Sequence, residues 1–286
     1  MDRRILDLYD EYTHAPLPRR VFLERLAGLA GSSAAAMALL PLLDSNYAHA
    51  AVAGNDARLA TETVSWRGPS GEIRGYLVTP RSGPAKRAGV IVIHENRGLT
   101  PHIRDVARRA ALEGFTALAP DLLAPHGGTP EDEDKGRDLF AKHVNREYAH
   151  LDVLPAIALL ESRGDASGKV GAMGFCFGGG VVNMLAVAAP SLDAGVVFYG
   201  RQAPVADVPK IRARLLLHYA GNDPGVNAGM AAYESALKEA GVRYEQHVYA
   251  GAQHAFHNDT SAARYDKAAA ELAWSRTVAF LKAALA

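Results

Sequence analysis

The segment Gly-Phe-Cys-Phe-Gly-Gly-Gly at residues 174–180 constrains the fold of this chain more than any other stretch. An apolar run at residues 169–173 precedes it, and an apolar stretch of small residues at 181–189 follows it. A strand, then glycine-x-nucleophile-x-glycine, then a helix is the pattern of a nucleophile elbow. The flanking glycines have no Cβ, so strand and helix can approach closely around a sharp turn. The pattern predicts that the side chain of Cys176 projects from the tip of this turn.

Cys176 is the only cysteine in the chain, and its position suggests a reactive thiol. A sulfur at the positive, N-terminal end of a helix is stabilised as the thiolate, which is the nucleophilic form. The alternative is a buried structural cysteine beside a glycine-rich turn. The nucleophile is favoured because an acid and a histidine follow at matching places further along the chain.

Strands and helices are predicted to alternate from residue 61 onward. Residues 63–67 and 73–79, separated by Gly-Pro-Ser-Gly, are typical of an antiparallel hairpin. The nearly continuous apolar run at 89–94 indicates a strand buried on both faces. Further strands are expected at 115–119, 169–173, 195–199, 215–219 and 244–249, and helices at 101–113, 137–143, 152–162, 181–189, 228–240 and 265–284. This order predicts an α/β fold with a mostly parallel central sheet and helices on both faces.

Two further reactive side chains follow predicted strands. Asp223 comes after the strand at 215–219, and His254 comes after the strand at 244–249. Functional side chains of parallel sheets gather at the carboxyl ends of the strands, and the order nucleophile, acid, histidine is that of α/β-hydrolases. A neutral imidazole can take the thiol proton, and a carboxylate can fix its tautomer. Asp121 is a rival acid and His257 a rival histidine.

The segment His-Glu-Asn-Arg-Gly at residues 94–98 ends the predicted buried strand. In α/β-hydrolases the loop after this strand supplies one N–H group of the oxyanion hole, and the residue after the nucleophile supplies the other. We assign these groups to the backbones of Asn96 and Phe177. Glu95 is then expected close to Cys176, although it could instead be a solvated loop acid or an ion partner of Arg97.

Composition excludes several classes of protein. The chain has 286 residues, 49% of them hydrophobic, with 31 basic and 31 acidic side chains. A net charge of zero gives no electrostatic argument for binding nucleic acid or an anionic membrane. A single cysteine rules out an internal disulfide framework and any Cys-x-x-Cys metal site. No apolar run is long enough for a permanent membrane span.

The N-terminal part, residues 1–58, is expected to be separate from a catalytic domain at 59–286. Arg19 and Arg20 are followed by Phe-Leu, a mildly apolar region at 26–43 and the sequence Ala-His-Ala at 48–50. This order resembles a twin-arginine export signal and would imply a periplasmic protein. The alternative is a helical arm that packs on the body or on a partner subunit, which leaves a cytoplasmic location and a homodimer open.

From about residue 61 the chain resembles the dienelactone hydrolase family of α/β-hydrolases, also called carboxymethylenebutenolidases. The resemblance is carried by the motifs G-F-C-F-G-G, H-E-N-R-G-L, A-P-D-L, Y-A-G-N-D and G-A-Q-H-A-F. It implies the α/β-hydrolase fold and a triad of Cys176, His254 and Asp223. Glu95 matches a family glutamate that holds the resting thiol inactive until substrate displaces it. The implied reaction opens an enol-lactone through a thioester, without a metal or organic cofactor.

Two positions depart from the family pattern. The arginines that clamp the carboxylate of dienelactone align with Pro125 and Asn258. Arg97, Arg201 and Tyr199 are the remaining candidates for substrate binding at this edge of the sheet.

The sequence therefore predicts a cysteine-dependent hydrolase of small esters or lactones. The alternatives are a non-catalytic binding or thiol-sensor protein on the same fold, and a hydrolase of another bond such as a phosphotriester.

Overall fold

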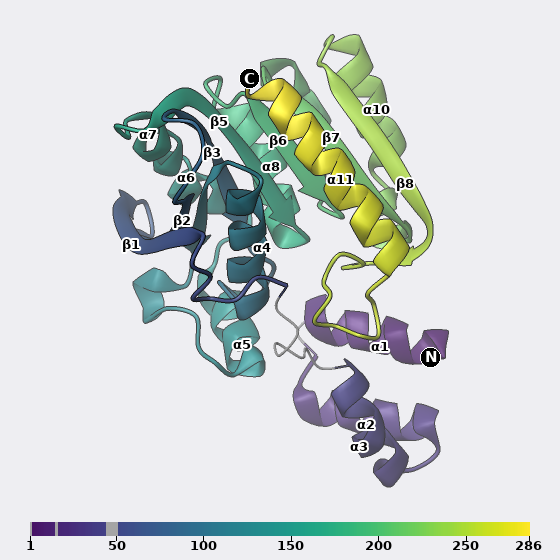
Figure 1. Ribbon diagram of the computed structural model, residues 1–286. Coiled ribbons are helices and arrows are strands. Elements are labelled where there is room, and N and C mark those ends of the chain that lie inside the picture. The colour runs from purple at the N-terminus through teal and green to yellow at the C-terminus, as the bar shows by residue number, and fades with distance from the viewer. Residues whose placement is uncertain (1, 15–16, 44–50) are drawn as a thin grey trace.

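The protein is built around one eight-stranded sheet (Figure 1). The computed structural model describes residues 2–14, 17–43 and 51–286. The strand order is β1-β2-β4-β3-β5-β6-β7-β8. The strands are β1 (Leu59–Gly68), β2 (Gly71–Pro80), β3 (Arg87–Ile93), β4 (Thr116–Asp121), β5 (Ala166–Phe175), β6 (Ala194–Phe198), β7 (Arg214–Asn222) and β8 (Tyr244–Gln253). Every strand predicted from the sequence is present.

The sheet is mostly parallel, as predicted. β1 and β2 form the expected antiparallel hairpin, and β2 is also antiparallel to β4. All pairs from β4 through β3 and β5 to β8 are parallel. β3 is buried from its third residue to its end, as expected of a central strand covered on both faces. This arrangement brings the carboxyl ends of β3, β5, β7 and β8 to one edge of the sheet.

Helices cover both faces of the sheet. One apolar cluster packs α4 and α11 on one face, and a second packs α7, α8 and α10 on the other (Figure 1). The helices of this body are α4 (Pro101–Leu112), α5 (Glu133–His143), α6 (Ala149–Val153), α7 (Pro155–Glu161), α8 (Phe177–Ala188), α9 (Pro224–Asn227), α10 (Met230–Glu239) and α11 (Lys267–Ala284). The short 3-10 turns η2 (Ala124–His126) and η3 (Val205–Lys210) complete it. The predicted α/β class is confirmed.

The largest differences from the sequence prediction concern three of the predicted helices. α8 begins at Phe177 rather than 181, because the three glycines at 178–180 form its first turn. The helix expected at 152–162 is divided into α6 and α7, and Pro155 begins the second of them. α5 begins at Glu133, where the side chain of Asp132 accepts hydrogen bonds from the backbone N–H groups of Asp134 and Lys135.

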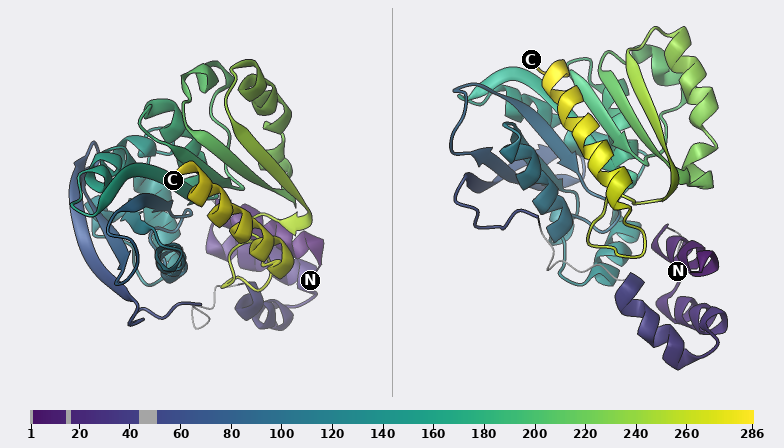
Figure 2. Two further views of the ribbon diagram at one scale, coloured as in Figure 1. Left: turned by 45° about the horizontal axis from the view of Figure 1, so that its top comes forward. Right: turned by 45° about the vertical axis from the view of Figure 1, so that its right-hand side comes forward.

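The N-terminal residues form three helices that pack mainly on one another. They are α1 (Arg3–His14), α2 (Arg19–Ala30) and α3 (Ser33–Leu43), and together we call them the arm. Their shared apolar cluster includes Leu8, Tyr9, Phe22, Leu26 and Leu43. Figures 1 and 2 show the arm at one end of the molecule, beside the loop between β8 and α11.

None of the three described helices of the arm has, by itself, the length and hydropathy of a membrane span. Within the described ranges only α2 and α3 together pass that test, as a pair bent by 110°. The Ala-His-Ala of the predicted export signal lies outside the described residues. Export therefore stays a prediction.

Candidate active site

Cys176 occupies a strained turn between β5 and α8. Its φ of 55° and ψ of −115° are unfavourable for a residue with a side chain. The turn is held by hydrogen bonds from the Cys176 N–H to the Phe198 carbonyl at 3.0 Å and from the Gly180 N–H to the Cys176 carbonyl at 3.2 Å. The surrounding structure thus fixes the backbone that presents the sulfur.

The two glycines that flank Cys176 are required by space. A Cβ on Gly174 would overlap the carbonyl of Gly178, and a Cβ on Gly178 would overlap the carbonyl of Ile93. Both clashes are with backbone, which cannot turn aside as a flexible side chain can. Strand β5, helix α8 and the end of β3 meet here only because both positions lack a side chain.

Asp223 and His254 meet at the same edge of the sheet. β7 ends one residue before Asp223, and β8 ends one residue before His254. Nδ1 of His254 lies 2.6 Å from Oδ2 of Asp223, and both side chains are buried. The other carboxylate oxygen of Asp223 accepts the N–H of Val226 at 3.1 Å, which fixes its orientation. The carboxylate can therefore hold one tautomer of the imidazole.

Once the sulfur of Cys176 is ionised, the charges around His254 favour its protonated form. Burial lowers the pKa of His254, but the sulfur of Cys176 and the carboxylate of Asp223, through charge and hydrogen bonds to the ring, raise it well above its usual value. The imidazole thus lies between an acid on one side and the thiol on the other. This arrangement can accept a proton from sulfur and stabilise the resulting cation.

The two rival residues have other contacts. Asp121 accepts hydrogen bonds from the N–H groups of Leu123 and Thr129 and from the Thr129 hydroxyl, so it holds the loop after β4. His257 is buried, and its ring lies 5.1 Å from that of Phe175. Burial, with electrostatic contributions from His102 and Arg109, lowers the pKa of His257 to about 3. The structure brings His254, not His257, to Asp223.

A small cavity of about 20 Å³ collects most of the predicted site residues. Its lining includes Cys176, His254, Glu95, Asn96 and Arg97. Asn258, where the family resemblance expects an arginine, lines the same cavity, and so do Thr13, Glu133 and Arg264, which no sequence pattern indicated. Thr13 belongs to the arm, which lies outside the family resemblance.

Backbone strain is concentrated around this cavity. In the described part of the chain, the non-glycine residues with positive φ are Cys176 at 55°, Tyr199 at 39° and Ala255 at 65°. Cys176 and Ala255 line the cavity, and the ring of Tyr199 lies 5.1 Å from the ring of His254. Strained residues persist where the surrounding structure over-determines them, which is typical of functional sites.

Glu95 lies at the cavity and is held by Asn258. The side-chain amide of Asn258 donates a hydrogen bond of 3.0 Å to the Glu95 carboxylate. Arg97 forms its ion pair with Glu133, and its guanidinium donates a hydrogen bond of 3.3 Å to the Tyr9 hydroxyl. The ion pair of Arg97 is thus with Glu133, while the charge of Glu95 also helps to raise the pKa of Arg97, so the role of Glu95 as a partner of Arg97 stays an open alternative.

The other candidates for substrate binding lie outside the cavity lining. Tyr199 is fully buried beneath the site, and burial, with the charges of Glu95 and Cys176, raises the pKa of its phenol well above the usual value. Arg201 is exposed, and Pro125 lies in the η2 turn.

Within residues 2–14, 17–43 and 51–286, no cluster of three or more His, Cys, Asp or Glu side chains is placed to hold a metal ion.

Comparison with known proteins agrees with this geometry. Residues 73–285 match the model of the dienelactone hydrolase family. A protein of Saccharolobus solfataricus named "Putative carboxymethylenebutenolidase" is 34% identical over 248 residues, which are 74% of this chain and 94% of that protein. Protein usf of Aquifex pyrophilus is 35% identical over 219 residues, with 74% of this chain and 93% of that protein covered.

Solved structures show the same fold. The crystal structure named "Putative Dienelactone Hydrolase" from Klebsiella pneumoniae superposes with a TM-score of 0.67 at 25% identity, covering 78% of this chain and 99% of that one. A dienelactone hydrolase-like promiscuous phosphotriesterase from metagenomic libraries has a TM-score of 0.70 at 24% identity, covering 80% and 100%. The family model and the curated relatives settle the assignment: this chain belongs to the dienelactone hydrolase family.

Proposed function

We propose that the chain is a cysteine-dependent hydrolase of ester or lactone bonds. The observation that carries this proposal is the line of groups from Asp223 through His254 to Cys176, placed at a strained elbow beside one cavity. Each group has the contact that its role requires. The carboxylate orients the imidazole, and the imidazole handles the proton of the sulfur.

The first step forms a thioester. The sulfur of Cys176 attacks the carbonyl carbon of the substrate while its proton resides on His254. The negative charge moves to the carbonyl oxygen, where the backbone N–H groups of Phe177 and Asn96 are the proposed donors. Phe177 is the first residue of α8, so its N–H has no partner within the helix. The C–O bond then breaks, and the leaving oxygen takes the proton from His254.

The second step returns the free enzyme. His254 removes a proton from water, and the water oxygen forms a bond to the thioester carbon. The C–S bond breaks, the acid product leaves, and the proton returns to the sulfur. With a lactone, the alcohol and the acid stay in one product molecule. Asp223 stabilises the imidazolium in both steps.

We assign to Glu95 control of the resting thiol. Glu95 lines the same cavity as Cys176, and Asn258 holds its carboxylate. A negative charge at this place disfavours a second negative charge on sulfur. In the proposed cycle, substrate displaces Glu95 and the sulfur ionises only when a carbonyl is present. The thiolate is the species that oxidants attack, so the resting enzyme is protected.

The residues available to bind a substrate in this chain differ from the arginine clamp that binds dienelactone in the family. Asn258 holds Glu95, and Pro125 has no side-chain charge, so neither reproduces the arginine clamp of the family. Arg97 lines the cavity, but Glu133 balances its charge. We therefore propose small esters or lactones whose binding does not depend on a carboxylate.

The deciding experiment is a panel of p-nitrophenyl esters, small lactones with and without a carboxylate, and one phosphotriester. Wild type, Cys176→Ser and Cys176→Ala are assayed side by side. Rapid mixing with a slow ester, followed by intact mass spectrometry, should show one acyl group on the peptide that carries Cys176. Full activity in Cys176→Ala, or the acyl group on another residue, would refute the cysteine mechanism. Turnover of the phosphotriester alone would assign a different bond.

A further inference from the structure

The last turn of helix α1 lies directly over the catalytic cavity. Thr13 lines this cavity together with Cys176 and His254. The side-chain amide of Asn96 donates a hydrogen bond to the backbone carbonyl of Thr13. Asn96 is the residue to which we assign one N–H of the oxyanion hole. The arm thus contacts the loop after β3, to which we assign one donor for the substrate carbonyl.

The space left beneath α1 is too small for a substrate. The cavity that Cys176 lines measures about 20 Å³. A single water needs roughly 10–15 Å³ by this measure, whereas ligand pockets typically enclose about 300–1,000 Å³. With α1 in this position, the sulfur faces room for little more than a water.

A larger cavity of about 320 Å³ also borders His254, but it gives a substrate no contact with the sulfur. Arg3, Asp7 and Asp10 of α1 form one wall, and the loop around Asp223 forms another. Neither Cys176 nor Asn96 lines it. A molecule bound there contacts His254 and Asp223, but the sulfur is not part of the lining that it meets.

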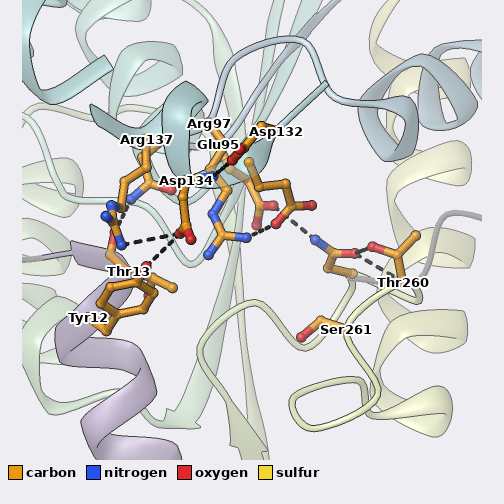
Figure 3. A network of polar contacts seen from close by, with 12 residues as sticks. Tyr12, Thr13, Glu95, Arg97, Asp132, Asp134, Arg137, Thr260 and Ser261 are labelled. Carbon is orange, nitrogen blue, oxygen red and sulfur yellow. Dashed lines mark hydrogen bonds and ion pairs between the residues drawn. The ribbon is translucent and has the colours of Figure 1, made fainter. Parts of the chain in front are cut away.

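The contacts that hold α1 on the body are mainly polar. The Tyr12 hydroxyl donates a hydrogen bond of 2.6 Å to Asp134 of α5, and Arg19 forms an ion pair with the same carboxylate. Asp10 lies 3.6 Å from Arg264. The guanidinium of Arg137 lies 4.1 Å from the centre of the Tyr12 ring (Figure 3). Water can replace such contacts, so breaking each of them costs little.

The arm can also move without losing its own core. In the described chain, its apolar cluster consists of arm residues and a single body residue, Ala263. An interface that is small in apolar area and rich in polar contacts is the kind across which parts of a chain move relative to each other.

We propose that α1 is a reversible autoinhibitory cap on Cys176, closed in this structure and held by Asp134 as its latch. Substrate reaches the sulfur only after α1 moves away, and the fraction of open molecules sets the apparent rate. This proposal rests on the proposed function only in treating Cys176 as the reactive residue of the cavity.

The test measures how fast Cys176 is alkylated in the full-length protein. Iodoacetamide serves as the small reagent and a biotinylated maleimide as the bulky one, with Tyr12→Phe and Asp134→Asn as the latch variants. If a variant loses about 1–2 kcal/mol of the free energy that holds α1 closed, the rate at which the bulky reagent alkylates Cys176 should rise by roughly 5- to 30-fold. Asp134→Asn should have the larger effect, because Asp134 also pairs with Arg19. Hydrogen exchange in α1 should rise in the same variants, while exchange in α4 stays unchanged.

Asp207→Asn is the matched control. It places the same substitution at an ion pair outside the arm and α5, because Asp207 pairs with Lys210 of η3. Its alkylation rate should equal that of wild type. Rates within twofold of wild type in both latch variants, with unchanged exchange in α1, would overturn the cap. Slower alkylation and lower turnover in these variants would also overturn it, because α1 would then support the site. Faster alkylation without ester turnover in any variant would keep the cap and refute the proposed hydrolase.

Discussion

Asn258 donates its side-chain amide to the Glu95 carboxylate over 3.0 Å, which ties the loop after β8 to the loop after β3. The amide oxygen of Asn258 accepts hydrogen bonds from the N–H of Thr260 at 3.1 Å and from its hydroxyl at 2.6 Å, so the orientation of the amide is fixed. Asn258 stands where the family resemblance expects a clamping arginine. In this chain the position holds an acid of the protein instead of the carboxylate of a substrate.

The first prediction concerns Glu95. Glu95→Gln removes a negative charge from the cavity of Cys176 while it keeps the shape of the side chain. Ester turnover should fall, and alkylation of Cys176 at neutral pH should become faster, because the carboxylate no longer disfavours the thiolate. The increase in the alkylation rate should be equal for small and bulky reagents. This distinguishes the effect of Glu95 from opening of the cap, which should mainly accelerate the bulky reagent. Unchanged turnover together with unchanged alkylation would leave Glu95 as a loop acid held by Asn258.

The second prediction compares the two neighbouring histidines. His254→Ala should lower kcat/KM by roughly two to four powers of ten, because the general base is lost. Asp223→Asn should have a somewhat smaller effect. His257→Phe keeps a ring among the aromatic neighbours of His257 and should retain activity within a few-fold. A severe loss in His257→Phe beside a mild one in His254→Ala would reverse the assignment.

Local patterns were enough to predict the elbow and the sheet. Apolar runs predict strands without any knowledge of the residues with which those strands later pair. Glycines at 174 and 178 are likewise expected wherever a strand and a helix approach this closely. The position of α1 could not be predicted in this way. It depends on individual pairs such as Tyr12 with Asp134, which are 122 residues apart and carry no local pattern. The same holds for Arg97 with Glu133, where the sequence offered only Glu95 as the nearby acid.

The third prediction concerns the space around the elbow. Gly178→Ala places a Cβ against the backbone of Ile93, and overpacking of this kind destabilises by about 1–3 kcal/mol or more. Gly180→Ala is the matched control in the same helical turn, because its nearest contacts lie at 3.6 Å. It should stabilise α8 by up to about 1 kcal/mol, since alanine favours a helix over glycine. Urea unfolding of both variants measures the difference, and equal stabilities would contradict the required close approach.

The last prediction follows from burial of a neutral histidine. The pKa of His257 is lowered to about 3 by burial, with His102 and Arg109 adding to the effect, while an unfolded histidine titrates near 6.5. Between these values the unfolded chain binds a proton that the folded chain does not. The free energy of unfolding should therefore fall by about 1.4 kcal/mol for each pH unit below about 6.5 on account of this residue. Its contribution is fully present above that pH.

His257→Phe keeps a ring in place and removes the titration, so its stability should depend less steeply on pH between 6 and 4.5. The raised pKa of His254 acts in the opposite sense and only above about pH 6.5, where its stabilising effect is lost as the pH rises, so it does not enter this window. The carboxylates titrate alike in both proteins and cancel in the difference. Equal slopes in wild type and His257→Phe would mean that His257 becomes protonated in the folded protein.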